Sequence, residues 1–245
     1  MAKLAIKKGI VKFRIDSREN AFNFSDLKTG WWYKWKSNEG RLLREYFKKN
    51  EYNLRPRQPE HEVETNIIRE MTKKSSEYKF GGKFRGIQQV MLAGCPLQMP
   101  LPVSGSSGAP KLARGNIDIL ARRVDEKRQI HLSVWELKKA GVTKTVIRKA
   151  IKQSLIYALV LAKILRSESG PEWYQIFGFR RKLADKFQIE AVVVLSTDDR
   201  KNFEEVWSEY KESLPITIGK DEVLPCVAFY DTSTYAIEWN RLTCS

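Results

Sequence analysis

The sequence predicts an α/β protein with a mixed central β-sheet flanked by helices, and three observations support this prediction. Residues 116–124 and 130–138 alternate like strands and are joined by a short polar turn, which predicts an antiparallel hairpin. Residues 144–165 are nearly all apolar in their second half, as expected of a helix buried on most sides. Residues 189–195 form a short apolar run, typical of a strand inside a mixed sheet.

The N-terminal residues 1–55 are predicted to be a basic and aromatic extension. Apolar and charged residues alternate over 10–15, which indicates a strand, and a polar segment follows to about residue 30. Residues 31–36 place four aromatic residues beside two lysines. Residues 41–49 have the pattern of a short basic amphipathic helix.

Three further elements are expected between this extension and the hairpin. Proline residues precede a helix at 60–74, whose apolar stripe consists of Val63, Ile67, Ile68 and Met71. Residues 78–93 are expected to form a strand or a strand pair. A long segment rich in Pro, Gly and Ser, 96–115, has the composition of a flexible loop.

The C-terminal part is predicted to alternate again between helix and strand. A loop rich in Gly and aromatic residues follows the long helix and leads to the strand at 189–195. An exposed helix is expected at 199–214, with Phe203, Val206 and Trp207 turned inward. A hairpin is expected at the end, with strands at 224–230 and 235–239.

The composition indicates a polyanionic partner. The 245 residues contain 44 Lys and Arg against 29 Asp and Glu, which gives a formal net charge of +15. Such a field concentrates phosphates near the surface, so nucleic acid is the first partner expected. The sequence has neither an apolar run of about 18 residues nor a lone basic amphipathic anchor, which argues against a membrane partner.

The cysteines indicate a reducing compartment. Cys95, Cys226 and Cys244 are far apart, and only His61 and His131 are available to join them. Neither a zinc site nor a disulfide framework is therefore expected. The first residues alternate charged with small apolar side chains and lack the apolar core of a secretory signal, so we expect a cytoplasmic protein.

Three charged residues interrupt the apolar pattern of the central hairpin. Glu136 and Lys138 lie on one face of their strand, and Asp118 interrupts the neighbouring strand. A Glu-x-Lys pair alone is typical of a solvated strand, but three charges at adjoining strand ends are costly unless they are paired or bind a metal. Mg²⁺ prefers oxygen ligands of this kind. Lys138 could then position the attacking water or stabilise developing negative charge.

These motifs resemble the PD-(D/E)XK nuclease superfamily. The resemblance consists of Gly115-x-x-Asp118 followed, after seventeen intervening residues, by Glu136-x-Lys138. It implies a restriction-endonuclease-like core over residues 60–195, within a nuclease domain at 56–245 that carries N-terminal and C-terminal additions. Ile117 stands where the family name has Pro, and the four cysteines that bind an iron–sulfur cluster in some members are absent.

The RecB-like branch of that superfamily is similar in its next helix. Gln153 and Tyr157, four residues apart, match its Gln-x-x-x-Tyr element, which is implied to support the site or contact nucleic acid. An acidic residue on the first helix is also implied. We expect Glu64 in this role, with Glu62 or Glu70 as alternatives. The expected metal ligands are the side chains of Asp118, Glu136 and Glu64 and the backbone carbonyl of Leu137.

Basic and aromatic residues outside this set are expected to contact nucleic acid, although solvated faces or packing would explain them equally. The lysine and arginine residues would contact backbone phosphates, and the tryptophans would stack on exposed bases. The predicted contact residues are Lys144, Arg148, Lys149, Lys152, Arg180, Arg181, Lys182, Trp31, Trp32 and Trp35.

The sequence therefore predicts a nuclease that hydrolyses DNA with Mg²⁺ or Mn²⁺ at Asp118 and Glu136, assisted by Lys138. Three alternatives stay open: a nucleic-acid-binding or scaffold subunit that does not cut, an RNA-directed nuclease, and a basic protein-interaction domain. The chain could act as a homodimer or within a larger protein complex.

Overall fold

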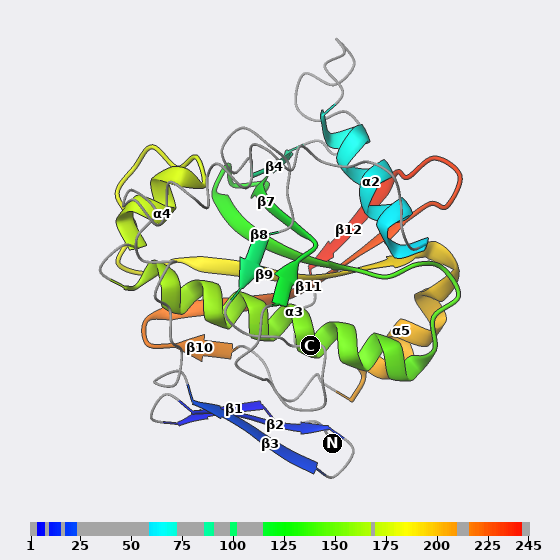
Figure 1. Ribbon diagram of the computed structural model, residues 1–245, viewed down its shortest axis with the longest axis horizontal. Helices are drawn as coiled ribbons and strands as arrows, with labels where there is room; N and C mark the ends of the chain where they lie inside the picture. Colours follow the sequence, from blue (N-terminus) through cyan, green and yellow to red (C-terminus); the bar gives the residue numbers. More distant parts are fainter. Residues whose placement is uncertain are drawn as a thin grey trace.

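The computed structural model describes residues 4–7, 10–15, 18–23, 59–72, 86–90, 99–101, 115–167, 170–209 and 216–241. A seven-stranded mixed sheet with helices packed against it forms the body of the molecule, which confirms the predicted α/β class and is compatible with a restriction-endonuclease-like core (Figure 1). The strands of this sheet are β4 (Ile87–Gln89), β7 (Ile119–Val124), β8 (Ile130–Leu137), β9 (Gln188–Ser196), β10 (Ile216–Ile218), β11 (Asp221–Tyr230) and β12 (Ile237–Arg241).

The strand order is β10-β11-β9-β8-β7-β4, with β12 also pairing with β11. The predicted hairpin is confirmed: β7 and β8 are antiparallel, with Ile119 opposite Trp135. The predicted apolar strand is also confirmed, because β9 lies inside the sheet between β8 and β11 and is parallel to both. All other neighbours in this sheet are antiparallel.

Helix α3 (Lys144–Leu165) begins and ends at the predicted residues and runs along one face of the sheet (Figure 1). Its first turn is capped by Thr143, whose hydroxyl accepts a hydrogen bond from the backbone N–H of Val146 at 3.4 Å. The buried side of α3 packs with Leu120, Val134 and other strand residues of the larger core cluster. Among the described residues no helix is long and apolar enough to cross a membrane.

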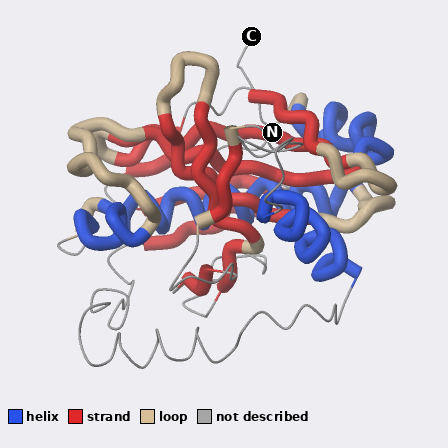
Figure 2. The backbone as a smooth tube through the Cα atoms, turned by 90° about the horizontal axis from the view of Figure 1, so that it is seen from above, coloured by secondary structure: helices blue, strands red, loops and turns tan. Residues whose placement is uncertain are grey.

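Helix α2 (Pro59–Thr72) packs against the opposite face of the sheet, as the alternation of strand side chains requires. In β8, Val134 belongs to the cluster under α3, whereas the next residue, Trp135, belongs to a second cluster. The apolar stripe predicted for α2 packs in that second cluster. Figure 2 shows the strands from above, with helices on both sides of them.

Several short elements were not predicted. β5 (Met99–Leu101) pairs with β6 (Gly115–Ile117), although residues 96–115 were expected to be a loop throughout. Leu101 is fully buried, so the expectation of a flexible loop throughout this segment was wrong there. α4 (Gly170–Ile176), held by the fully buried Trp173, lies in an expected loop. β10 extends the sheet at its edge.

The C-terminal elements agree with expectation except at their ends. A short 3₁₀ turn, η5 (Thr197–Asp199), leads into α5 (Arg200–Trp207), whose inward residues Phe203, Val206 and Trp207 are buried as predicted. The described part of this helix ends before the predicted position 214. The β11–β12 hairpin is confirmed, but β11 begins three residues earlier than expected, at Asp221.

The described part of the N-terminal extension forms a separate antiparallel sheet. Its strands are β1 (Leu4–Lys7), β2 (Ile10–Ile15) and β3 (Arg18–Asn23), so the predicted strand at 10–15 is confirmed and two neighbours are added. Several predictions lie outside the described residues: the aromatic cluster at 31–36, the helix at 41–49, and the parts of 78–93 that precede residue 86 or follow residue 90.

Candidate active site

Asp118 lies at a break between two strands. β6 ends at Ile117 and pairs with β5, whereas β7 begins at Ile119 and pairs with β8. The Asp118 Oδ2 atom accepts a hydrogen bond from the backbone N–H of Leu137 at 2.8 Å. A carboxylate is therefore tolerated inside this apolar run, because the chain changes its pairing partner there and leaves an N–H of β8 for the side chain.

Glu136 is a buried carboxylate beside Asp118. The β7–β8 register, continued by one residue, places the two positions opposite each other. Glu136 is 1% exposed; its Oε1 atom accepts a hydrogen bond from Lys138 Nζ at 2.7 Å. Within the described part of the chain, its Oε2 atom has no hydrogen-bond partner. One oxygen of this buried carboxylate is thus left without a partner, and a bound ion is one explanation for such an atom.

Burial disfavours the charged form of both carboxylates. Burial raises the pKa of Asp118 to about 6, although the charge of Lys138 and the hydrogen bond from Leu137 act in the opposite direction. Burial also raises the pKa of Glu136 well above its usual range, and the charge of Asp118 raises it further. A bound divalent cation would favour the charged form of both groups.

Lys138 joins the carboxylates to the first helix. Its ammonium group donates hydrogen bonds to Glu136 Oε1 at 2.7 Å, to Glu60 Oε1 at 2.9 Å and to the Leu137 carbonyl at 2.7 Å. Burial lowers the pKa of Lys138, but the charges of Glu136 and Asp118 outweigh that effect and raise it above its usual range. Lys138 is therefore a fixed positive charge within the site.

On α2, Glu60 contacts this cluster through Lys138, although Glu60 was not among the acidic residues expected from the sequence. The predicted residue, Glu64, lies one turn further along the same helix and is buried at 5% exposure. Positions four residues apart share a helix face, so the argument that favoured Glu64 applied equally to Glu60. The missed signal was that Glu60 stands in the first turn of α2, the part of the helix that reaches Lys138 after the end of β8.

Gln153 and Tyr157 lie together on α3, as predicted from their spacing. Gln153 Nε2 donates a hydrogen bond to the Tyr157 hydroxyl at 3.3 Å, and Tyr157 is 1% exposed. Tyr157 packs in the core cluster that also contains Val134, the residue two positions before Glu136 on the same strand face. The pair therefore belongs to the layer that covers the Glu136 face of the sheet.

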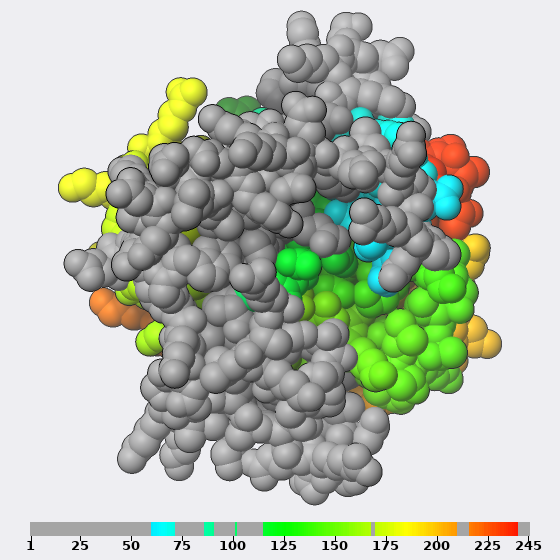
Figure 3. All heavy atoms as spheres, viewed as in Figure 1, coloured from blue at the N-terminus to red at the C-terminus, as the bar shows by residue number. Residues whose placement is uncertain are grey.

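The four basic residues predicted to contact nucleic acid on α3 differ in their environment. Lys144 forms an ion pair with Glu205, and Arg148 forms one with Glu209. Lys149 is exposed, whereas Lys152 is buried, and this burial lowers its pKa. The first half of α3 lies beside α2 on one surface of the molecule (Figure 3).

The second predicted contact group lies on the segment after α4. Arg180, Arg181 and Lys182 are all exposed there. The third predicted group, which contains Trp31, Trp32 and Trp35, lies outside the described residues.

The donor set fits a hard divalent cation. Among the described residues no group of three or more His, Cys, Asp and Glu side chains could hold a metal ion. Mg²⁺, however, is commonly held by one or two carboxylates, with water and phosphate oxygens in its other positions. Asp118 and Glu136 supply two carboxylates, one with an unsatisfied buried oxygen, and the Leu137 carbonyl is a third oxygen beside them.

No family model, curated protein or solved structure matches this chain. Its function is therefore inferred from the fold and from the site itself.

Proposed function

We propose that this chain is a metal-dependent nuclease that hydrolyses phosphodiester bonds of DNA. The observation that supports it most strongly is the unsatisfied Oε2 atom of Glu136, a 1% exposed carboxylate beside Asp118 and Lys138. A purely structural ion pair would be expected to satisfy both oxygens. An oxygen that lacks a partner is instead suited to bind a cation.

Each residue of the site would have a distinct role in the proposed reaction. Asp118, Glu136 and the Leu137 carbonyl would hold Mg²⁺ or Mn²⁺. The bound ion would supply an acidified water and neutralise charge on the phosphate. Lys138, already held by Glu136 and Glu60, would direct its charge toward the phosphate or the attacking water.

Supporting roles go to the residues around this centre. Glu60 would orient the Lys138 ammonium through the 2.9 Å hydrogen bond. The Gln153–Tyr157 pair would keep α3 in place over the sheet face that carries Glu136. Exposed cations such as Lys149, together with the overall charge of +15, would attract the DNA backbone.

The test is cleavage of linear, circular and single-stranded DNA with Mg²⁺, Mn²⁺ or EDTA. Wild-type protein should cut with either metal and not with EDTA, and Asp118→Ala or Lys138→Met should cut about 10²–10³-fold more slowly. Lys127→Met is the matched control for Lys138→Met, because it removes an exposed lysine at the other end of the hairpin. Cleavage by either site variant at the wild-type rate would contradict the proposal.

The same samples separate the alternatives. Metal binding without cleavage of any substrate would favour a silent nucleic-acid-binding subunit. Cleavage of RNA in preference to DNA would favour an RNA-directed nuclease with the same site.

A further inference from the structure

A cavity of about 280 Å³ lies at the other end of β8 from the candidate active site. Its lining includes residues 130–132 at the start of β8, whereas Glu136 and Lys138 lie at the end of that strand. Six strand residues span roughly 20 Å, so the two sites are separate. The volume is near the lower limit of about 300 Å³ for small-ligand sites, which suits one planar ring rather than a peptide.

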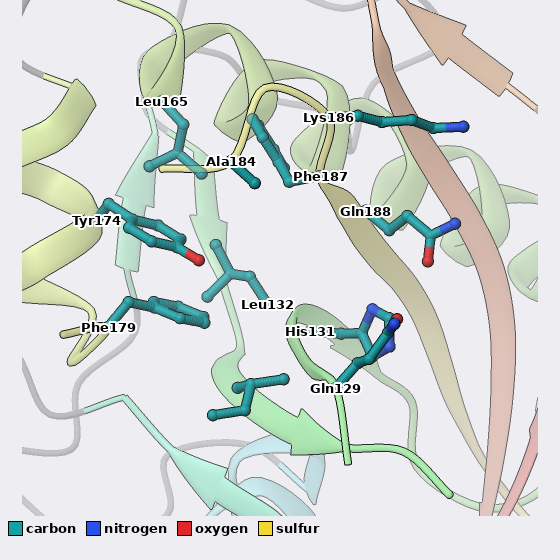
Figure 4. Close-up of a pocket in the computed structure, with 11 residues that line it drawn as sticks. Gln129, His131, Leu132, Leu165, Tyr174, Phe179, Ala184, Lys186, Phe187 and Gln188 are labelled. Carbon is teal, nitrogen blue, oxygen red and sulfur yellow. The ribbon is translucent and has the colours of Figure 1, made fainter. Parts of the chain in front are cut away.

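The lining combines aromatic rings with hydrogen-bonding groups. The rings of Tyr174 and Phe179 are stacked, with centroids 4.1 Å apart and planes at 8°. Figure 4 shows them on one side of the cavity, with Gln129 and His131 on the other. His131 Nε2 is already paired with Asp125 Oδ2 at 2.9 Å, so the Gln129 amide is the polar group of this wall that faces a ligand. A fatty chain would not need such an amide, whereas a nucleobase presents both a ring face and a polar edge.

The wall formed after α4 is anchored to the sheet. Arg122 Nη1 donates a hydrogen bond to the Gly178 carbonyl at 2.6 Å, and Gly178 has a φ of +86°. A side chain would be strained at this φ, and its Cβ atom would lie 2.3 Å from Arg122 Nη1, so the arginine would have to move. Phe179, the next residue, is thereby fixed at the cavity.

The second wall is anchored from the end of α3. Arg166 forms an ion pair with Asp221 and donates a hydrogen bond to the Asp185 carbonyl at 2.8 Å. Its guanidinium also lies over the Phe187 ring, 4.5 Å from the centroid. Two arginines thus hold both walls, and the cavity exists before any ligand arrives.

Exposed positive charge stands next to this cavity. Phe179 and Ala184 both line it, and the residues between them include the exposed Arg180, Arg181 and Lys182. Lys186 is not part of this charge, because it pairs with Glu222 and points away from the cavity in Figure 4. Three cations beside a ring-sized cavity complement a phosphate attached to a base.

We infer that this cavity binds the base of a nucleotide, with Arg180, Arg181 and Lys182 contacting the adjoining phosphate. The base could come from a single-stranded part of the substrate or from a free nucleotide. The first source rests on the proposed nuclease function, whereas binding of a base does not.

The experiment is calorimetry on the full chain in EDTA, with adenosine 5′-monophosphate, adenosine, ribose 5-phosphate and pentadeoxyadenylate as probes. We expect the monophosphate to bind at least tenfold more tightly than ribose 5-phosphate, which lacks the base. Ala184→Trp should fill the cavity from an exposed position and weaken nucleotide binding at least tenfold. Ser208→Trp, which adds the same side chain at an exposed position on α5's end, is the matched control and should bind like wild type.

A second variant keeps the cavity intact. Arg181→Gln/Lys182→Gln should weaken the monophosphate severalfold and leave adenosine unchanged. Tighter binding of pentadeoxyadenylate than of the monophosphate supports a base within a strand, and the reverse supports a free nucleotide. Equal binding of ribose 5-phosphate, or no loss in either variant, would overturn the inference. Because EDTA prevents metal-dependent cleavage, these outcomes do not depend on whether the chain cuts DNA.

Discussion

Two buried glutamates in neighbouring strands of the same sheet have opposite surroundings. Glu190 of β9 is fully buried, and both of its oxygens are used: Arg123 Nε lies 2.9 Å from each, and Ser133 Oγ donates to Oε2 at 3.0 Å. Glu136 of β8 accepts from Lys138 at one oxygen only. Arg123 is in turn held over the Trp239 ring, 4.8 Å from its centroid.

The difference separates a structural charge from a functional one. A buried carboxylate whose oxygens are all paired contributes to the fold, and removing its partner is costly. A buried carboxylate with an unsatisfied oxygen weakens the fold in exchange for a binding capacity. The same residue type thus has two roles in this protein, which can be separated by measuring stability and activity on the same variants.

The largest expected effect is on stability at the structural glutamate. Glu190→Leu should lower the free energy of unfolding by about 3–5 kcal/mol, because it leaves the half-buried Arg123 guanidinium without its carboxylate. Denaturant unfolding measures this change. The double variant Arg123→Leu/Glu190→Leu should recover most of the loss. DNA cleavage well below the unfolding temperature should stay near wild type, and a loss of more than tenfold would refute the assigned division of roles.

The functional glutamate should respond in the opposite way. Glu136→Gln should slow metal-dependent cleavage about 10²–10³-fold, since the amide is a poor metal ligand. Its free energy of unfolding without metal should not fall, because the substitution removes a buried charge that is only half paired. Glu126→Gln, in the exposed turn of the same hairpin, is the control. A variant that unfolds more easily and cuts normally would place Glu136 in the structural class.

Metal binding at the functional site should depend on pH. The pKa of Asp118 is about 6, so below that pH a proton competes with the metal for this carboxylate. The affinity for Mg²⁺ should therefore fall by up to about tenfold for each pH unit below 6, as measured by calorimetry. Affinity that stays constant from pH 7 to pH 5 would exclude Asp118 as a ligand.

The same carboxyl group, Asp118, should make the free energy of unfolding change with pH in the opposite direction. The folded protein holds the Asp118 proton more tightly than the unfolded chain, where the pKa is near 3.8. Without metal, the free energy of unfolding should thus decrease as the pH rises from about 4 to about 6. Asp118→Asn should remove this component of the pH profile.

The smallest expected effect distinguishes the two glutamates of α2. Glu60→Gln should slow cleavage roughly threefold to tenfold, because it weakens one charged hydrogen bond to Lys138 at a position that is 38% exposed on its side chain. Glu64→Gln is the parallel variant at the position that the sequence predicted. A larger loss of cleavage rate in Glu64→Gln than in Glu60→Gln would show that Glu64 is the acidic residue of α2 that supports the site.

Much of the sheet could be predicted because its strongest signals are local. The length and apolar character of α3 and the alternation in β7 and β8 are readable in windows of ten to twenty residues. By contrast, β5 forms through the pairing of residues 99–101 with 115–117. A pattern of three residues is too short to predict a strand that pairs with a distant segment. The short helix α4 was missed for a similar reason, since the burial of Trp173 depends on α3 rather than on its neighbours in sequence.

The site shows the same limit. Asp118, Glu136 and Lys138 were predicted because charge interrupts an apolar alternation. Glu60 was not, because several glutamates lie on α2 and only the packing of that helix decides which one reaches Lys138. The unsatisfied oxygen of Glu136 could not be predicted at all, since it depends on the position of every neighbouring donor.

The three hydrogen bonds of the Lys138 ammonium have a consequence for ligand exchange. Without metal, this group serves as an internal counterion to Glu136, so an arriving cation meets a carboxylate that is already partly neutralised. Lys138→Met should then tighten Mg²⁺ binding while it slows cleavage about 10²–10³-fold, and the strongest metal binder of the series would be one of its slowest nucleases. The positive charge of Lys138 thus weakens metal binding in the wild-type protein. The same charge is needed for cleavage.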